Sequence, residues 1–158
     1  MVKIAVGQEL KLDNVLSLRA KIKQEDIQLT LKQIGQYLER VNIQKQGPIV
    51  TATFGVEQIS TGNIVDIEIL IPTDKRFQPE GPYTFKEKFH LVNAVYARHT
   101  GNPASLENTY RDAMSFITSN DLQPITAGYS VNVNELSPSQ SPEDLIIDIF
   151  IGINPSIL

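Results

Sequence analysis

The chain has 158 residues, of which 41% are hydrophobic and 20% charged, with a net charge of −4 and no cysteine. This length fits one domain, or two small halves sharing a core, and the lack of cysteine excludes disulfides and thiolate metal sites. The acidic balance and the absence of a basic run argue against nucleic-acid binding and anionic-membrane binding, so we expect a cytoplasmic protein.

The first half of the chain predicts a strand, a helix and two further strands. Apolar and polar residues alternate over 14–22, where Leu16, Leu18, Ala20 and Ile22 would face inward. A helix is expected from about Gln24, and its apolar stripe consists of Ile27, Leu31, Ile34, Leu38 and Val41. Strands over 49–58 and 64–71 follow, separated by a turn at 60–63. Residues 72–82 are polar, with prolines and a glycine, and predict a linker.

The second half repeats this order. A strand is expected over 92–100, and Asn102 followed by Pro103 predicts the start of a helix. That helix runs over 106–117 and its stripe consists of Leu106, Tyr110, Ala113 and Ile117. Strands over 124–134 and 145–153 complete the half, on either side of a loop rich in serine and proline at 137–142.

Leu10–Gln44 aligns with Phe89–Gln123 without a gap, and after a short gap the closing strand 65–71 matches 147–153. The same order of strand, helix and closing strand in both halves predicts a tandem duplication. We therefore expect one α+β domain built from two βαββ units, over residues 10–71 and 83–154.

Chain topology follows from the handedness of such units. A right-handed β-α-β crossover leaves room for the third strand between the first two, antiparallel to both. Each half would then be a three-stranded sheet in the order 1-3-2, with its helix on one face. The residues expected on the opposite, open face are Ser17, Arg19, Asp66, Glu68, Leu70, Tyr96, Arg98, Asp148, Phe150 and Gly152. Two such faces side by side would form a shared groove.

Residues 93–101, the helix over 106–117 with Tyr110, and the ending 148–151 together resemble the GyrI-like domain. That domain is the small-molecule-binding module of bacterial multidrug-responsive regulators, and it also occurs alone as a gyrase inhibitor and in enzymes that hydrolyse reactive drugs. The resemblance implies a stand-alone effector-binding protein with a carboxylate in the groove that meets cationic aromatic drugs. Glu68 and Asp148 are the positions able to supply it. Gly152 and Asn154 depart from the family's usual ending.

The predicted ligand-binding set combines these two acids with the aromatic and charged residues expected around them. It consists of Glu68, Asp148, Tyr96, Arg98, Phe150, Tyr129, Arg19 and Asp66. An ordinary alternative is that these carboxylates only form cross-strand ion pairs, Arg19 with Asp66 or Glu68 and Arg98 with Asp148. Both interpretations are compatible with the sequence.

Signals for other chemistry are weak. His90 and His99 lie too far apart on one strand to chelate a metal, and His99 is expected to point toward the helix as a hydrogen-bonded interior residue. No phosphate-binding loop or activated nucleophile is recognisable, so we predict no catalytic residue, metal or cofactor. The favoured function is small-molecule binding. The alternatives are a protein-interaction module or inhibitor that uses the groove or a sheet edge, and, least favoured, a hydrolase of reactive small molecules.

Overall fold

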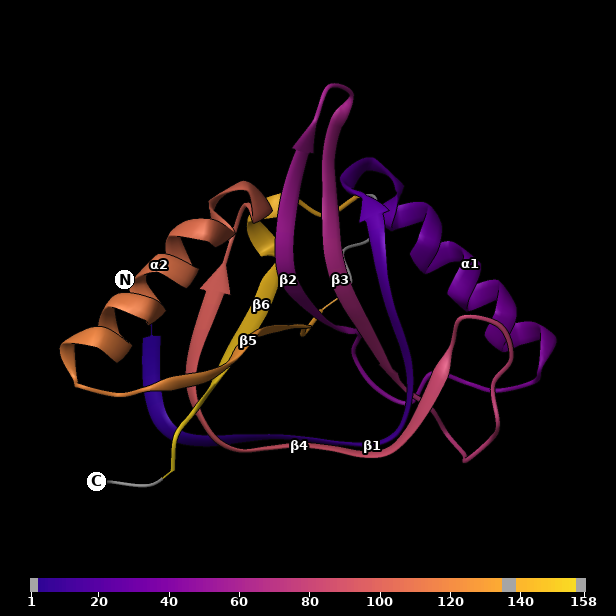
Figure 1. Cartoon of the computed structure of the whole chain (residues 1–158), viewed down its shortest axis with the longest axis horizontal. Helices are drawn as coiled ribbons and strands as arrows, with labels where there is room; N and C mark the ends of the chain where they lie inside the picture. The colour runs from indigo at the N-terminus through magenta and orange to yellow at the C-terminus, as the bar shows by residue number, and fades with distance from the viewer. Residues whose placement is uncertain (1–2, 135–138, 156–158) are drawn as a thin grey trace. The chain divides into compact units, whose positions relative to one another are not determined.

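The computed structural model of the chain describes residues 3–134 and 139–155, over which it contains six β-strands, two α-helices and three short 3-10 helices (Figure 1). The chain forms two compact units. Residues Leu12–Phe89 make the first, called here the N-terminal unit. Residues up to Lys11 and from His90 onward make the second, called the C-terminal unit.

The elements follow one another in the order that the sequence predicts. The first group comprises β1 (Lys3–Lys23), η1 (Gln24–Asp26), α1 (Ile27–Arg40), β2 (Val50–Ile59) and β3 (Gly62–Pro72). The second comprises β4 (Thr84–Thr100), η2 (Pro103–Ser105), α2 (Leu106–Ser119), β5 (Pro124–Asn132), η3 (Pro142–Asp144) and β6 (Ile146–Ile153). Strands β1 and β4 contribute residues to both units.

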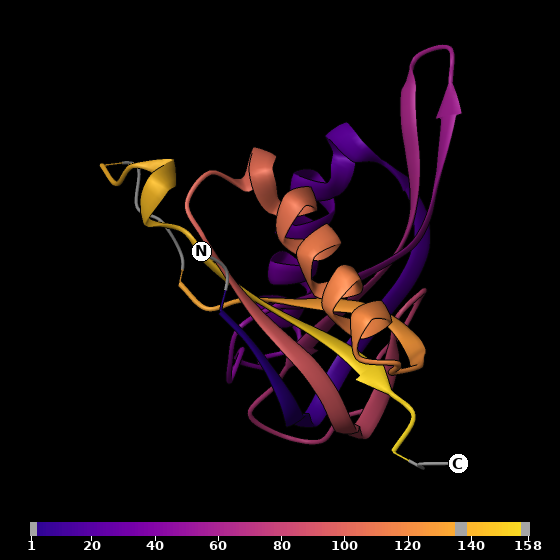
Figure 2. The same ribbon diagram turned by 90° about the vertical axis from the view of Figure 1, so that its left-hand side faces the viewer.

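In the N-terminal unit β3 pairs with β1 on one side and β2 on the other, antiparallel to both, which confirms the predicted order. Arg19 on β1 and Ala52 on β2 both lie opposite Glu68 of β3. A β-bulge between Thr53 and Gly55 shifts the register of β2. Beyond the bulge β1 stays paired with β3 as far as Ile64, and the β2–β3 hairpin extends past β1 to its turn (Figures 1 and 2).

The C-terminal unit repeats this pairing. Its closing strand β6 lies between β4 and β5 and is antiparallel to both. Arg98 on β4 lies opposite Asp148, and Tyr129 on β5 lies opposite Phe150. The element order strand, helix, strand, strand is thus present in each unit, whereas the tandem duplication, the predicted unit boundaries and the groove between the halves stay predictions.

Helix α1 packs on the N-terminal sheet through its apolar stripe, as predicted. Ile34 and Leu38 are buried in one cluster with Ile67 and Ile69, and Leu31 packs against that cluster. The prediction for Val41 is wrong: it is 37% exposed, because the helix ends at Arg40 and the chain then leaves the helical path, with a φ of 60° at Asn42.

Helix α2 covers the C-terminal sheet in the same manner (Figure 2). Ala113 and Ile117 are buried with Ile149 and Ile151, and Tyr110 is partly buried against them. The Asn102 side chain accepts a hydrogen bond of 2.9 Å from the Ala104 backbone N–H, so it caps the 3-10 turn that precedes α2.

Two strands begin well before their predicted first residues. β1 starts at Lys3 rather than 14, and β4 at Thr84 rather than 92. The early part of β1 bends at Gly7, with a φ of 67°, and again at Asn14, with a φ of 54°. Glycine and asparagine within an alternating segment indicate a turn or bulge, so the sequence predicts a strand only over 14–22.

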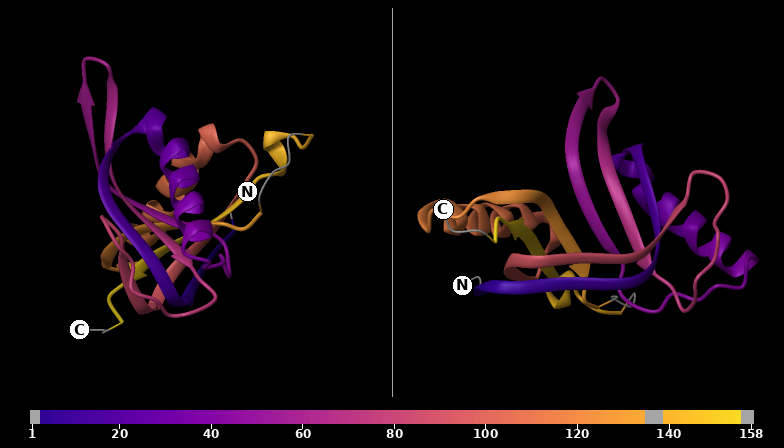
Figure 3. Two further views of the ribbon diagram at one scale, coloured as in Figure 1. Left: turned by 90° about the vertical axis from the view of Figure 1, so that its right-hand side faces the viewer. Right: turned by 60° about the horizontal axis from the view of Figure 1, so that its bottom comes forward.

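The predicted linker holds no helix or strand after Pro72, but it is packed against the N-terminal unit. Phe77 and Tyr83 contact the cluster beneath α1, and the Tyr83 ring stacks on Tyr37 at 4.6 Å between centroids. The Tyr37 hydroxyl also accepts the Glu80 backbone N–H at 2.9 Å. The segment accordingly runs beside α1 (Figure 3). Of the predicted loop at 137–142, residues 137 and 138 lie outside the described residues.

The packing of the closing strands predicts matched losses of stability. Ile69→Ala and Ile149→Ala should each lower the free energy of unfolding by about 2–5 kcal/mol, since each removes a buried side chain beneath a helix. Val56→Ala, at an exposed position of β2, is the control and should change it by less than about 0.5 kcal/mol. Urea denaturation measures all three. Losses below about 1 kcal/mol for both buried variants would show that the face assignment is inverted.

Candidate functional site

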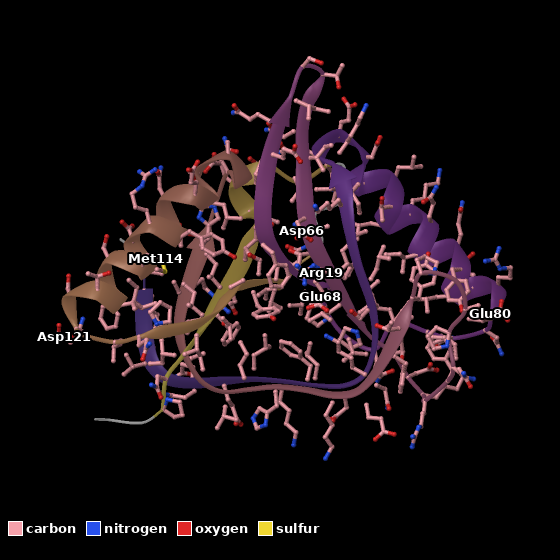
Figure 4. All side chains as sticks on the ribbon, in the orientation of Figure 1. Arg19, Asp66, Glu68, Glu80, Met114 and Asp121 are labelled. Atoms are coloured by element: carbon pink, nitrogen blue, oxygen red, sulfur yellow. The ribbon has the colours of Figure 1, made fainter. Side chains whose placement is uncertain are left out.

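The predicted charged residues of the N-terminal unit do lie on one face of its sheet, opposite to α1. The pairs Arg19–Glu68 and Lys21–Asp66 are directly opposite in the β1–β3 register, and alternation sends their side chains to the face that Ile67 and Ile69 do not occupy. Figure 4 shows Asp66, Arg19 and Glu68 close together beside β1 and β3.

Arg19 and Asp66 form a two-pronged ion pair. Arg19 Nε donates to Asp66 Oδ1 at 2.9 Å, and Nη2 donates to Oδ2 at 3.1 Å. The guanidinium carbon also lies 3.8 Å from the centroid of the Phe54 ring, in a cation–π arrangement. The hydrogen bonds from Arg19 hold the pKa of the Asp66 carboxyl below its usual range. Both carboxylate oxygens of Asp66 are therefore engaged by one arginine.

Glu68 has a different environment. It is 8% exposed, and its Oε2 accepts hydrogen bonds from the Ser17 hydroxyl at 3.0 Å and from the Lys86 ammonium at 2.8 Å. Among the residues that the structure describes, Oε1 of Glu68 accepts no hydrogen bond. Glu68 is thus a mostly buried carboxylate whose Oε1 still reaches solvent, because no fully buried side-chain oxygen of the described residues lacks a partner. This oxygen is available for a further polar or charged contact.

A shallow hollow lies along the same face, next to the Arg19–Asp66 pair. It has a volume of about 220 Å³ and is lined by Lys21, Gly55, Val56, Glu57, Ile64 and Asp66. Pockets for drug-sized molecules measure roughly 300–1,000 Å³. The hollow is large enough for part of such a ligand only.

The C-terminal unit carries its own polar cluster on the face opposite to α2. Arg98 Nε donates to Asp148 Oδ1 at 2.8 Å and Nη2 donates to Oδ2 at 3.0 Å, while the Tyr96 hydroxyl donates to Oδ1 at 2.9 Å. The rings of Tyr96 and Phe150 are tilted against each other at 5.3 Å. Both oxygens of Asp148 therefore accept hydrogen bonds, as those of Asp66 do.

The same cluster shifts two pKa values. Burial and the hydrogen bond to Asp148 raise the pKa of the Tyr96 phenol, so this group stays protonated over a wider range. The hydrogen bond and charge of Asp148 raise the pKa of Arg98, which is cationic at any working pH. Tyr129, opposite Phe150 on the neighbouring strand, is buried.

One expectation about this face needs correction, and one is confirmed. The prediction that the face is open is wrong at several positions, because Ser17, Glu68, Leu70 and Gly152 are all buried. Close packing explains Gly152: a Cβ there would lie 2.8 Å from the Thr126 methyl carbon. The predicted pairing of Arg98 with Asp148 is confirmed, and Arg19 pairs with Asp66.

Sequence reasoning missed the residues that engage Glu68. The predicted strand over 92–100 does not include Lys86. The early part of β4 nevertheless alternates, with Thr84, Lys86 and Lys88 on one face and Phe85, Glu87 and Phe89 on the other. That alternation was the available signal for a strand. The role of Ser17 as a buried hydrogen-bond donor had no signal, since a serine in a strand commonly faces solvent.

His99 behaves as predicted. It is buried, its Nδ1 lies 2.8 Å from the Thr109 hydroxyl on α2, and its Nε2 lies 3.0 Å from the Asn102 carbonyl oxygen.

Within residues 3–134 and 139–155 the structure contains no group of histidine and acidic side chains able to hold a metal ion. None of the helices in these ranges has the length and apolar character needed to cross a membrane.

Solved structures share this fold. The C-terminal domain of EcmrR aligns with a TM-score of 0.81 and 17% identity over 98% of this chain and 98% of that domain. A longer EcmrR chain, in a complex with DNA within the EcmrR-RPo assembly, aligns with a TM-score of 0.79 and 18% identity over 96% of this chain. The present chain spans 57% of the length of that EcmrR chain.

More distant structures include SAV2435 bound to tetraphenylphosphonium, with a TM-score of 0.53 and 10% identity over 98% of this chain and 94% of that one. A hydrolase from Listeria innocua gives a TM-score of 0.62 and 10% identity over 97% and 91%. No protein-family model and no curated protein sequence matches the chain. At these identities the likeness shows the fold alone.

The Arg19–Asp66 pair predicts a pH-dependent contribution to stability. Because the pKa of Asp66 is lower in the folded state, the contribution is present above the unfolded pKa and is lost as the pH falls through the folded pKa. Asp66→Asn should therefore lower the melting temperature at pH 7 and have a vanishing effect in strong acid. Asp112→Asn, at an exposed position on α2, is the control. Melting curves from pH 2 to 7 in which Asp66→Asn and wild type stay equally stable throughout would contradict this.

Proposed function

We propose that this protein binds small molecules, in particular lipophilic organic cations, and that the Glu68 carboxylate is the contact for the ligand's charge. One observation carries the proposal: Glu68 is largely buried, yet among the described residues its Oε1 accepts no hydrogen bond. The fold shared with SAV2435, whose solved structure holds tetraphenylphosphonium, supports this class of ligand.

The surroundings of the three acids favour Glu68 over Asp66 and Asp148. Each of the latter two has both oxygens occupied by the guanidinium of one arginine. Two-pronged arginine–carboxylate pairs are the strong ones, and a ligand cation would have to break such a pair or bind beside its fixed positive charge. At Glu68 a ligand meets a carboxylate with one oxygen already available.

Burial strengthens the interaction that Glu68 offers. An attraction between opposite charges grows as the effective dielectric constant falls, and it is larger at a mostly buried carboxylate than at a solvated one. Phe54, held against Arg19 near the hollow beside Asp66, offers an aromatic surface in the same unit. The C-terminal unit holds the other predicted ligand contacts, and the proposal for Glu68 does not include them: Tyr96, Arg98, Tyr129, Asp148 and Phe150.

We infer that binding, rather than catalysis, is the function. A hydrolase shares the fold, but a nucleophilic residue needs a lowered pKa or a neighbouring base. The Tyr96 phenol meets neither condition, because burial and Asp148 raise its pKa and the carboxylate beside it, Asp148, is already paired with Arg98. A protein-interaction role is the remaining alternative, and titration with a small-molecule ligand distinguishes it from small-molecule binding.

Calorimetric titration with tetraphenylphosphonium tests the proposal. The wild-type protein should bind it saturably, and Glu68→Gln should weaken binding by at least about 1 kcal/mol, the scale of one charge-assisted contact. Asp148→Asn is the matched control, since it removes an equal charge that is already saturated by Arg98 and Tyr96. It should change the affinity less than Glu68→Gln does.

Two results would overturn the proposal. Equal affinity of wild type and Glu68→Gln would remove Glu68 as the charge contact. A lack of saturable binding of tetraphenylphosphonium and also of neutral triphenylphosphine oxide would exclude the small-molecule function. Co-purification of a defined protein partner in that second case would favour the interaction module.

A further inference from the structure

We propose that Lys86 is a built-in counter-ion of Glu68, which weakens the attraction of the carboxylate for a ligand cation and thereby sets the charge selectivity of the site. This inference rests on the proposed function of Glu68. It gives the early part of β4 a role in the site, because the Lys86 ammonium competes with a ligand cation for the Glu68 carboxylate.

The geometry around Glu68 separates a fixed partner from a displaceable one. Ser17 is buried on β1 and donates to Oε2 from the neighbouring strand of the same sheet. Lys86 reaches the same oxygen with its ammonium at 2.8 Å, and its side chain is 37% exposed against 11% for that of Glu68. The ammonium is therefore the more accessible member of the ion pair.

The surroundings of the Lys86 ammonium are those that a ligand cation would use. The nitrogen lies 2.8 Å from the carboxylate and 5.9 Å from the centroid of the Phe89 ring. A carboxylate together with an aromatic ring is a common combination for binding organic cations. Lysine is suited to leaving such a position, because its charge sits on a flexible four-carbon stem and is readily hydrated.

A definite consequence for selectivity follows. With Lys86 on Oε2, the pair of Lys86 and Glu68 is close to neutral, and a cationic ligand at Oε1 gains the full attraction of the carboxylate only when the ammonium leaves. A ligand of the same shape without a positive charge has no such competitor. Removal of the ammonium should thus make the site more selective for cations than the wild-type site is.

Tetraphenylphosphonium and tetraphenylborate test this directly, because they have nearly the same shape and opposite charge. The quantity measured is the ratio of their dissociation constants. Lys86→Met should shift the ratio about tenfold toward the phosphonium, the equivalent of one charge-assisted contact. Lys86→Arg should stay near the wild-type ratio, since it keeps the positive charge. The double variant Lys86→Met/Glu68→Gln should not show this shift of the ratio toward the phosphonium, because it lacks the carboxylate.

Lys88→Met is the matched control, because it removes an equal charge at an exposed position two residues further along β4, and it should leave the ratio unchanged. If Lys86→Met does not fold, Lys86→Gln serves in its place with the same expected direction. An unchanged ratio in a variant that still binds both ions overturns this inference and leaves the proposed function intact. Failure of every variant to bind either ion, or the neutral phosphine oxide, overturns both.

Discussion

The register of β3 against β1 is the constraint on which the site and the core of the N-terminal unit both depend. In this register Ile67 and Ile69 face α1, while Asp66 and Glu68 face the opposite side of the sheet. A slip of one residue would place the carboxylates under the helix and the isoleucines on the other face. The cost of burying two unpaired charges beneath α1 makes that slip prohibitive. Packing of the helix therefore also fixes the position of the candidate ligand contact.

The acidic residues on the closing strands β3 and β6 differ in how they are engaged, because different side chains hydrogen-bond to each of them. Asp148 lies opposite Arg98 in the β4–β6 register and receives a two-pronged guanidinium, and Asp66 receives one from Arg19. Glu68 lies opposite Arg19, but that arginine is already committed to Asp66, so a single hydroxyl and a lysine ammonium engage Glu68. Because Arg19 pairs with Asp66, Asp66 forms a two-pronged ion pair, while one oxygen of Glu68 stays available.

Much of the fold was predictable because alternation and helical spacing report directly on burial. The stripe of α1 and the alternation of β3 located Ile34 and Ile69, and the order of strands followed from the crossover rule. The prediction did not include the early part of β4, although Phe85 and Phe89 alternate there with charged residues as they do in a strand. Partner choice could not be predicted either: the sequence allowed Arg19 to pair with Asp66 or Glu68, and only the diagonal geometry across β1 and β3 selects Asp66.

The central claim is that the Glu68 carboxylate meets the charge of the ligand. Carbon-13 NMR of the side-chain carboxyl groups during titration with tetraphenylphosphonium tests this directly at the atom concerned. The account predicts a saturable change in the Glu68 carboxyl resonance, with the Asp148 resonance, held by Arg98, changing little and serving as an internal reference. A saturable change at Asp148 with Glu68 unaffected would contradict the account.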